Sequence, residues 1–303
     1  MHILITGGTG FIGQALVPQL LGSGHRITIL SRGRHRDSEQ CNFVRSLNEL
    51  PADNGPDAVI NLAGASLAGK RWTPAYKEEI VASRVDGTRE LVEFLASRAQ
   101  PPRALLSASA IGYYGPRGDQ PLTETAPPGL GFSSELCQAW EAEALKAEGL
   151  GVRTCLLRLG VVLDREGGAL REMAMPFRFG IATWPGTGHQ YLSWVHRVDV
   201  VAAMTMLLEQ DDLAGAFNVT APTPVTQREF CAAMQKQFRT LPAIPAPGPV
   251  MRLMLGEMAG ELLLSGQRVE PAALEAADFT FAYPGIDRAL AAVFDPQAGD
   301  RLP

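Results

Sequence analysis

The feature that most limits how this chain can fold is a glycine pattern at its N-terminal end. An apolar, β-branched run at 2–6 leads into Thr6-Gly7-Gly8-Thr9-Gly10-Phe11-Ile12-Gly13, and an amphipathic segment follows at 11–21. In such a strand–loop–helix unit, glycines allow a tight turn, close approach to a pyrophosphate and close packing of the helix on the strand. The first amide groups of the helix then point at the phosphates. The pattern predicts a dinucleotide-binding loop in preference to an ordinary surface turn, with cofactor neighbours Gly7, Thr9, Gly10, Phe11, Ile12 and Gly13.

Strand-like and helix-like segments alternate through the first half of the chain and again near residue 200. Nearly continuous apolar runs typical of buried strands occur at 2–6, 26–30, 57–64, 103–109, 152–160 and 216–220. Helical patterns occur at 11–21, 74–97, 134–148 and 198–209. This alternation predicts βαβ units with right-handed crossovers and helices on both faces of a parallel sheet. The expected fold class is therefore α/β, with a Rossmann-like doubly wound parallel sheet.

The character of the sequence changes after Gly160, where glycine, proline and arginine become frequent. We expect residues 1–165 to form the dinucleotide-binding domain, with its sheet completed by about 195–220. Residues 166–194 and 221–303 are expected to form a smaller mixed C-terminal substrate domain. The proline-rich stretch 241–249 predicts a linker or a surface loop.

Composition excludes several classes of protein. The chain has 303 residues, 46% hydrophobic and 19% charged, which is typical of a globular enzyme. Its formal net charge of −5 argues against a nucleic-acid partner. The four cysteines are widely spaced, the five histidines lack metal-site spacing, and the apolar runs are too short to span a membrane. With no signal peptide expected, the prediction is a cytoplasmic protein with no bound metal and no membrane partner.

The residues after the second predicted strand indicate which dinucleotide is bound. An NAD site usually places an acidic residue there, to hold the ribose 2′-hydroxyl. This chain instead has Ser31-Arg32, with no acidic residue before Asp37. An arginine pairs well with a 2′-phosphate, and Ser31 adds a hydrogen-bond donor. The expected cofactor is NADP(H), although a solvated run of surface charge is the alternative interpretation.

Together these residues resemble the extended short-chain dehydrogenases. Asn61-Leu62-Ala63-Gly64 is similar to the family's segment on the adenosine side of the cofactor, and Val85-Asp86-Gly87-Thr88 to its cofactor-facing helix. Ser107-Ala108-Ser109 resembles the serine-rich strand end, which makes Ser107 a cofactor neighbour and matches Ser109 to the catalytic serine. The stretch 186–199 resembles the region that carries substrate-binding residues in sugar-nucleotide epimerases.

A narrower resemblance covers nearly the whole chain. The segments 70–73, 83–84, 140–141 and 262–269 resemble the atypical "epimerase family" branch, in which a small C-terminal domain of unknown function follows the dehydrogenase fold. Relatives in this branch are sometimes named cell-division inhibitors, which does not define a reaction. The resemblance implies the cofactor neighbours Ser31, Arg32, Leu62, Ala63, Gly64, Glu79, Arg84 and Val162.

The family's Tyr-x-x-x-Lys pair is missing. In that pair the lysine lowers the pKa of the tyrosine, which can then transfer a proton while hydride moves. No tyrosine here has a lysine four residues later, and Leu136 and Trp140 stand where the pair belongs. Tyr114 together with Ser109 is the remaining candidate for holding a carbonyl or hydroxyl near the nicotinamide. The alternative is that Ser109 only ends a strand and that the tyrosines pack.

Aromatic and polar residues in the rest of the chain are candidates for substrate binding. Arg158 ends a predicted strand at the edge where ligands bind to parallel sheets. If the other candidates converge, they favour an anionic or ring-bearing substrate; otherwise the tryptophans belong to the core. His196 is expected to be structural. The substrate-binding candidates are Trp72, Arg158, Trp184, His189, Gln190 and Trp194.

Two functions from different classes remain open at this point. One is an NADP(H)-dependent oxidoreductase or epimerase acting on a small carbonyl or hydroxyl substrate. The other is a non-catalytic NADPH-binding sensor that acts through a protein partner. Whether the chain is an enzyme, which substrate it takes, and whether it is a monomer or a homodimer are not readable from the sequence.

Overall fold

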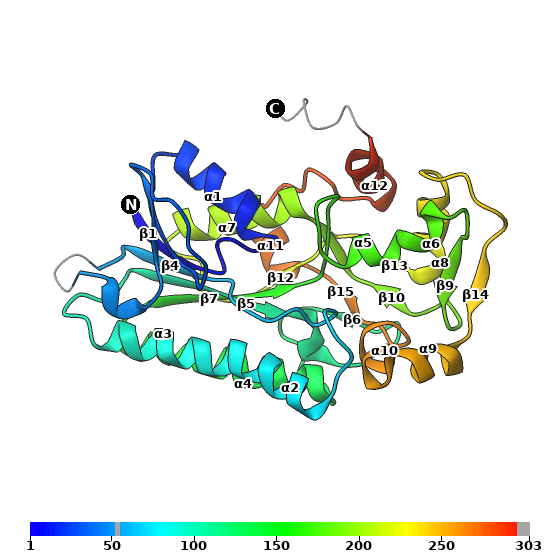
Figure 1. The fold of residues 1–303 in the computed structure, drawn as a ribbon, viewed down its shortest axis with the longest axis horizontal. Helices are drawn as coiled ribbons and strands as arrows, with labels where there is room; N and C mark the ends of the chain where they lie inside the picture. Colours follow the sequence, from blue (N-terminus) through cyan, green and yellow to red (C-terminus); the bar gives the residue numbers. More distant parts are fainter. Residues whose placement is uncertain (52–54, 296–303) are drawn as a thin grey trace.

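A computed structural model describes residues 1–51 and 55–295 of the chain (Figure 1). Its centre is a seven-stranded sheet in the order β12-β7-β5-β4-β1-β2-β3. Neighbouring strands in this sheet all pair in parallel. The strands are β1 (His2–Thr6), β2 (Arg26–Leu30), β3 (Cys41–Val44), β4 (Ala58–Asn61), β5 (Ala104–Ala110), β7 (Arg153–Leu159) and β12 (Gly215–Val219). The predicted α/β fold with a parallel Rossmann-like sheet is confirmed.

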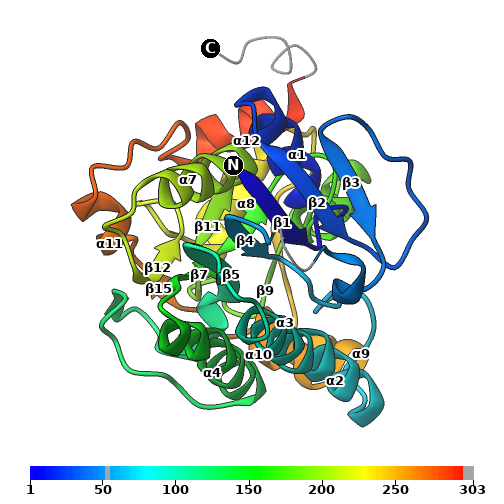
Figure 2. The same ribbon diagram turned by 90° about the vertical axis from the view of Figure 1, so that its left-hand side faces the viewer.

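Helices cover both faces of this sheet (Figure 2). One face carries α2 (Pro74–Val81), α3 (Gly87–Ala96) and α4 (Phe132–Leu145), and the other carries α1 (Gly13–Gly22) and α7 (Arg197–Glu209). Successive residues of a strand point to opposite faces, which explains the apolar runs. In β1, Leu4 packs in the cluster of α3 and α4, whereas Ile3 and Ile5 pack in the cluster of α1 and α7.

Two details of the sheet domain differ from the sequence prediction. The strand β3 was not expected, since its short run CNFV carries a polar residue and lies at the sheet edge. The helix expected over 74–97 is interrupted by a π-helical turn at Ala82–Asp86, between α2 and α3. Such turns are rare and occur frequently at functional sites. This one carries Arg84, whose position is described below.

Most of the remaining segments form small elements that lie beyond one end of the sheet in Figure 1, whereas α11 (Ala272–Ala276) packs against β12. Short paired strands are β6 (Pro121–Leu122) with β15 (Arg268–Val269), β8 (Val161–Leu163) with β11 (Trp194–His196), β9 (Thr183–Pro185) with β14 (Ile244–Ala246), and β10 (Tyr191–Leu192) with β13 (Val225–Thr226). The helices are α5 (Ala169–Met173), α6 (Met175–Arg178), α8 (Gln227–Gln235), α9 (Gly248–Leu255), α10 (Glu257–Leu262), α11 (Ala272–Ala276) and α12 (Ile286–Phe294).

The proline-rich stretch 241–249 is not only a loop, because β14 within it pairs in parallel with β9. A proline is accepted in β14 because it lies at the edge of a two-stranded sheet. Within the described part of the chain, no helix has both the length and the apolar character required to cross a membrane. The four cysteines are free and buried.

Candidate active site

The glycine loop forms one wall of the site because side chains cannot be accommodated there. Gly7 has a φ of +69°, and a Cβ on it would lie 2.6 Å from the Leu62 carbonyl. A Cβ on Gly13 would lie 2.4 Å from the Gly8 carbonyl oxygen. The Gly10 amide donates to the Gly7 carbonyl at 2.9 Å, which closes the turn before α1. The loop therefore brings bare backbone to the surface, as a pyrophosphate requires.

This loop borders a cavity of about 570 Å³ at the carboxyl ends of the sheet strands, which is the usual position of a ligand in such folds. Residues from both ends of the chain line it: Gly7, Gly10, Phe11, Ile12 and Gly13 after β1; Leu62, Ala63, Gly64, Ser66 and Leu67 after β4; Ala108, Ser109, Ala110, Ile111, Gly112, Gly115 and Pro116 at and after β5; Arg84, Ser133, Leu136, Cys137 and Trp140 on helices; Leu159, Gly160, Val161, Val162 and Gly168 around β8; and Glu261, Leu262 and Gln267 near the C-terminal end.

Arg84 contributes a buried positive charge to the cavity wall. Its guanidinium lies 5.3 Å from the centre of the Trp140 ring and donates a hydrogen bond to the Ile80 carbonyl, at 3.4 Å. It has no carboxylate partner among the described residues. Burial lowers the pKa of Arg84, because the charged form loses its hydration. A buried guanidinium without an acidic partner is suited to bind an anion such as a phosphate.

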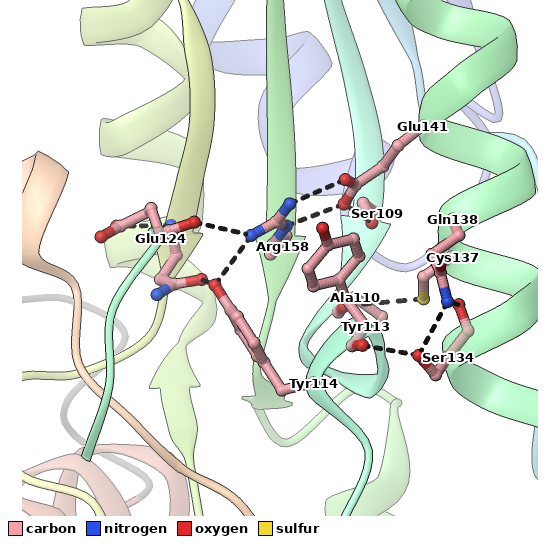
Figure 3. Close-up of polar contacts among 11 residues, drawn as sticks. Ser109, Ala110, Tyr113, Tyr114, Glu124, Ser134, Cys137, Gln138, Glu141 and Arg158 are labelled. Carbon is pink, nitrogen blue, oxygen red and sulfur yellow. Dashed lines mark hydrogen bonds and ion pairs between the residues drawn. The ribbon is translucent and has the colours of Figure 1, made fainter. Parts of the chain in front are cut away.

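Ser109, at the end of β5, belongs to a buried polar network (Figure 3). Its Oγ donates a hydrogen bond to Oε1 of Glu141 at 2.6 Å. Arg158 donates from Nε to Oε1 and from a terminal nitrogen to Oε2 of the same carboxylate, each at 2.8 Å. Ser109 and Arg158 are register partners on adjacent parallel strands, so their side chains point to the same face of the sheet, toward α4. The bidentate ion pair fixes the Glu141 carboxylate in position.

Tyr114 also belongs to this network, and it does not line the cavity. Its hydroxyl donates to Asn218 at 2.6 Å and receives a hydrogen bond from Arg158 at 2.9 Å. The side chain is completely buried, and this burial raises the pKa of Tyr114 although Arg158 acts in the opposite direction. The predicted pairing of Tyr114 with Ser109 at the substrate is therefore not what the geometry shows. Arg158 binds the Tyr114 hydroxyl directly, whereas it holds the Ser109 hydroxyl only through Glu141.

Most of the predicted cofactor neighbours meet at the cavity. Those in its wall are Gly7, Gly10, Phe11, Ile12, Gly13, Leu62, Ala63, Gly64, Arg84 and Val162. The others lie outside the wall: Thr9 is exposed, Glu79 pairs with Lys70 at the surface, and Ser107 is buried behind it, where it accepts a hydrogen bond from Asn61.

Ser31 and Arg32 follow β2, directly beside the glycine loop, because Leu30 pairs in register with Thr6. The Ser31 hydroxyl is 3.0 Å from a ring nitrogen of His35. Arg32 is exposed and has neither an ion pair nor a hydrogen bond within the described part of the chain. Its guanidinium is therefore available to a ligand at the edge of the site.

The predicted substrate-binding residues do not converge on the cavity, and none of them is in its wall. Trp194 is completely buried in the core, and Trp72 packs with Tyr76 and Trp140. Trp184 lies under the guanidinium of Arg228. His189 is exposed, Gln190 donates to the Pro185 and Leu263 carbonyls, and Arg158 is held by the network described above. The core interpretation holds for Trp194, and Gln190 joins two segments of the chain.

The sequence missed the polar residues that the C-terminal segment brings to the cavity. The carboxylate of Glu261 accepts hydrogen bonds from the Phe132 and Ser133 amides, both at 3.1 Å, at the start of α4. Gln267 also lies in the wall. Although Gln267 falls in the segment 262–269 that carries the family resemblance, no local pattern places either residue at the site, because each comes from a segment remote in sequence.

Burial raises the pKa of Cys137, in the same wall, to about 11, which disfavours its thiolate form near neutral pH.

The glycine cradle, the unpaired guanidinium and the serine at the end of β5 define a dinucleotide-binding α/β protein of the dehydrogenase type. Residues 3–220 match the family described as NAD-dependent epimerase/dehydratase, and residues 246–293 match a domain of unknown function, DUF1731. The chain belongs to this NAD-dependent epimerase/dehydratase family.

Individual relatives support the same assignment. The chain is 39% identical to an epimerase family protein of Staphylococcus aureus over 95% of this chain and 97% of the relative. It is similar to the crystal structure of human epimerase family protein SDR39U1 with NADPH, with 32% identity, a TM-score of 0.87, and coverage of 98% and 100% of the two chains. A nucleoside-diphosphate sugar epimerase from Corynebacterium glutamicum is 30% identical, with a TM-score of 0.78, over 97% of this chain and 58% of that one.

Proposed function

We propose that this protein binds NADP(H) in the cavity and acts as an oxidoreductase or epimerase on a small carbonyl or hydroxyl substrate, without a Tyr-x-x-x-Lys pair. The observation that carries the proposal is that one cavity has the glycine loop in one wall and Ser109 in another. A single site can therefore hold a dinucleotide and place its substrate against a polar group. The human relative whose title names NADPH supports the choice of cofactor.

The residues present fit such a cofactor. The glycine loop leaves room for a pyrophosphate, Arg84 offers an unpaired guanidinium to a phosphate, and Arg32 is free to pair with a 2′-phosphate. When bound, the nicotinamide supplies hydride chemistry. The protein orients the ligand between the loop and Ser109, excludes water with apolar wall residues, and offers the Ser109 oxygen to a hydroxyl or carbonyl.

The cofactor part of the proposal is tested by titrating the protein with NADPH and NADH, with Arg32→Ala as the variant. A charged hydrogen bond to the 2′-phosphate contributes about 1.5–3 kcal/mol, so wild type should prefer NADPH by roughly 10- to 100-fold, and Arg32→Ala should lose that preference. Arg34→Ala, an exposed arginine of the same loop, is the matched control and should retain it. Equal binding of both dinucleotides by wild type would contradict the proposal.

A second candidate function is favoured by one observation. The helix α9 exposes Leu253 and Met254 at 78% and 68% of their surface, and Phe179 and Leu241 are similarly exposed. Exposed apolar side chains of this size fit a protein partner, as a non-catalytic NADPH sensor would need. Turnover of a defined metabolite with NADP(H) would make this alternative unnecessary.

The free cysteines agree with the cytoplasmic location that we propose for either function.

A further inference from the structure

The hydrogen-bond polarity of Ser109 limits what its neighbour in the cavity can be. A serine hydroxyl has one proton, and here that proton is directed at Oε1 of Glu141, 2.6 Å away. Arg158 holds this acceptor in place through two hydrogen bonds. Ser109 lies in the cavity wall, and its hydroxyl, which also contacts Cys137, has no second proton to give, so a ligand group that binds its oxygen must donate a hydrogen bond.

The part of the cavity wall near the start of α4 carries a negative charge. Glu261 brings a carboxylate to the wall, and the amides at the start of α4 hold it there. The Ser133 hydroxyl is buried and lacks a hydrogen-bond partner within residues 1–51 and 55–295. A hydroxyl group on a ligand suits these residues, because it can give one hydrogen bond and accept another.

Arg84 is the one basic residue among the described residues of the wall, and it lies beside Gly64 on the dinucleotide side. If the cofactor's phosphates use Arg84, no cation of the wall remains for a second diphosphate. A neighbouring hollow outside Glu261 does carry Arg252, but Glu257 and Glu261 line it too. The charges therefore oppose a nucleotide-linked substrate.

We propose that the substrate of this protein is a small, uncharged molecule that carries a hydroxyl group, bound as a hydrogen-bond donor to Ser109, and is not a nucleoside-diphosphate sugar. Glu141 is the positioning residue that sets this preference, by holding the Ser109 proton away from the cavity. The inference rests on the proposed function, because it takes the cavity to be shared with NADP(H). It goes further in naming the substrate class.

The proposal is tested with a matched pair of probes on protein saturated with NADPH. Cyclohexanol and cyclohexanone have nearly the same shape, but only the alcohol donates a hydrogen bond. Ligand-observed NMR measures their dissociation constants, and loss of NADPH absorbance reports any turnover. We expect cyclohexanol to bind wild type about 3- to 10-fold more tightly than cyclohexanone. UDP-glucose should not displace the alcohol.

Two variants separate positioning from a structural role. In Glu141→Leu, the acceptor of the Ser109 proton is removed, so that proton can turn to the cavity and the ketone should become the preferred probe. Glu143→Leu makes the same change elsewhere on α4, where Glu143 pairs with Arg89 and Lys146, and should leave the preference unchanged. Ser109→Ala tests the same point if Glu141→Leu does not fold, and it should bind both probes equally.

The outcomes distinguish this inference from the proposed function. Failure of NADPH to bind removes the proposed function and the inference with it. Normal NADPH binding with equal binding of the two probes, with binding of neither, or with displacement of cyclohexanol by UDP-glucose overturns the substrate class only. An unchanged preference in a folded Glu141→Leu protein overturns the positioning role.

Discussion

The buried ion pair between Glu141 and Arg158 should behave as a unit when either partner is replaced. Their side chains are only 6% and 5% exposed, and two hydrogen bonds of 2.8 Å join them. Removing one partner leaves the other charged and buried, which costs about 3–5 kcal/mol, whereas replacing both with apolar residues costs much less than the sum. We therefore predict that Arg158→Met and Glu141→Leu each destabilise strongly, and that the double variant is little worse than either single one.

The expected shifts are large enough to measure by calorimetry. An unfolding entropy of about 2.1 cal/mol/K per residue gives roughly 0.6 kcal/mol/K for 303 residues. A loss of about 3–5 kcal/mol therefore lowers Tm by about 5–8 °C in each single variant. Because the two residues are coupled, the loss of stability in the double variant should be at least about 2 kcal/mol smaller than the sum of the losses in the two single variants.

The matched control is the ion pair between Glu143 of α4 and Lys146, the residue that follows this helix. Lys146 lies 2.6 Å from Glu143 and is itself 58% exposed, so Lys146→Met should cost less than about 1 kcal/mol, or under about 2 °C in Tm. The reasoning is refuted if Arg158→Met behaves like Lys146→Met, or if the two single changes simply add in the double variant.

Two further predictions concern the glycine loop and pH. Gly7→Ala places a Cβ against Leu62 at positive φ, so it should destabilise by about 1–3 kcal/mol and weaken NADPH binding at least tenfold, whereas Gly22→Ala, in open space, should do neither. Burial lowers the pKa of His196 to about 4 from 6.5, so the unfolded chain binds the extra proton first as pH falls. About 3 kcal/mol of stability, present above pH 6.5, should be lost between pH 6.5 and about 4. Urea unfolding should show that the free energy of unfolding falls less across this pH range in His196→Gln than in wild type. If the two proteins have the same pH profile, His196 is not the group responsible.

The local sequence determined the sheet domain because its signals are short in range. The glycines of the first loop and the apolar runs can be interpreted from the residues next to them in the sequence. The succession of strands and helices along the chain therefore follows from the sequence. The edge strand β3 was missed because so short a polar-containing run has no clear period. The π-helical turn that carries Arg84 was missed because a turn of that kind leaves the helical pattern intact on both sides.

The chemistry of the site was decided by tertiary structure. The sequence marked Ser109 and Tyr114 as a pair, but register between β5 and β7 places Arg158 between them and directs Tyr114 to Asn218. Which atom receives the Ser109 proton depends on where α4 carries Glu141, and no spacing in the sequence records that distance. Glu261 reaches the same cavity from the C-terminal segment. Periodicity fixes which face of an element is buried, whereas the partner of a buried polar group is fixed only when the elements pack.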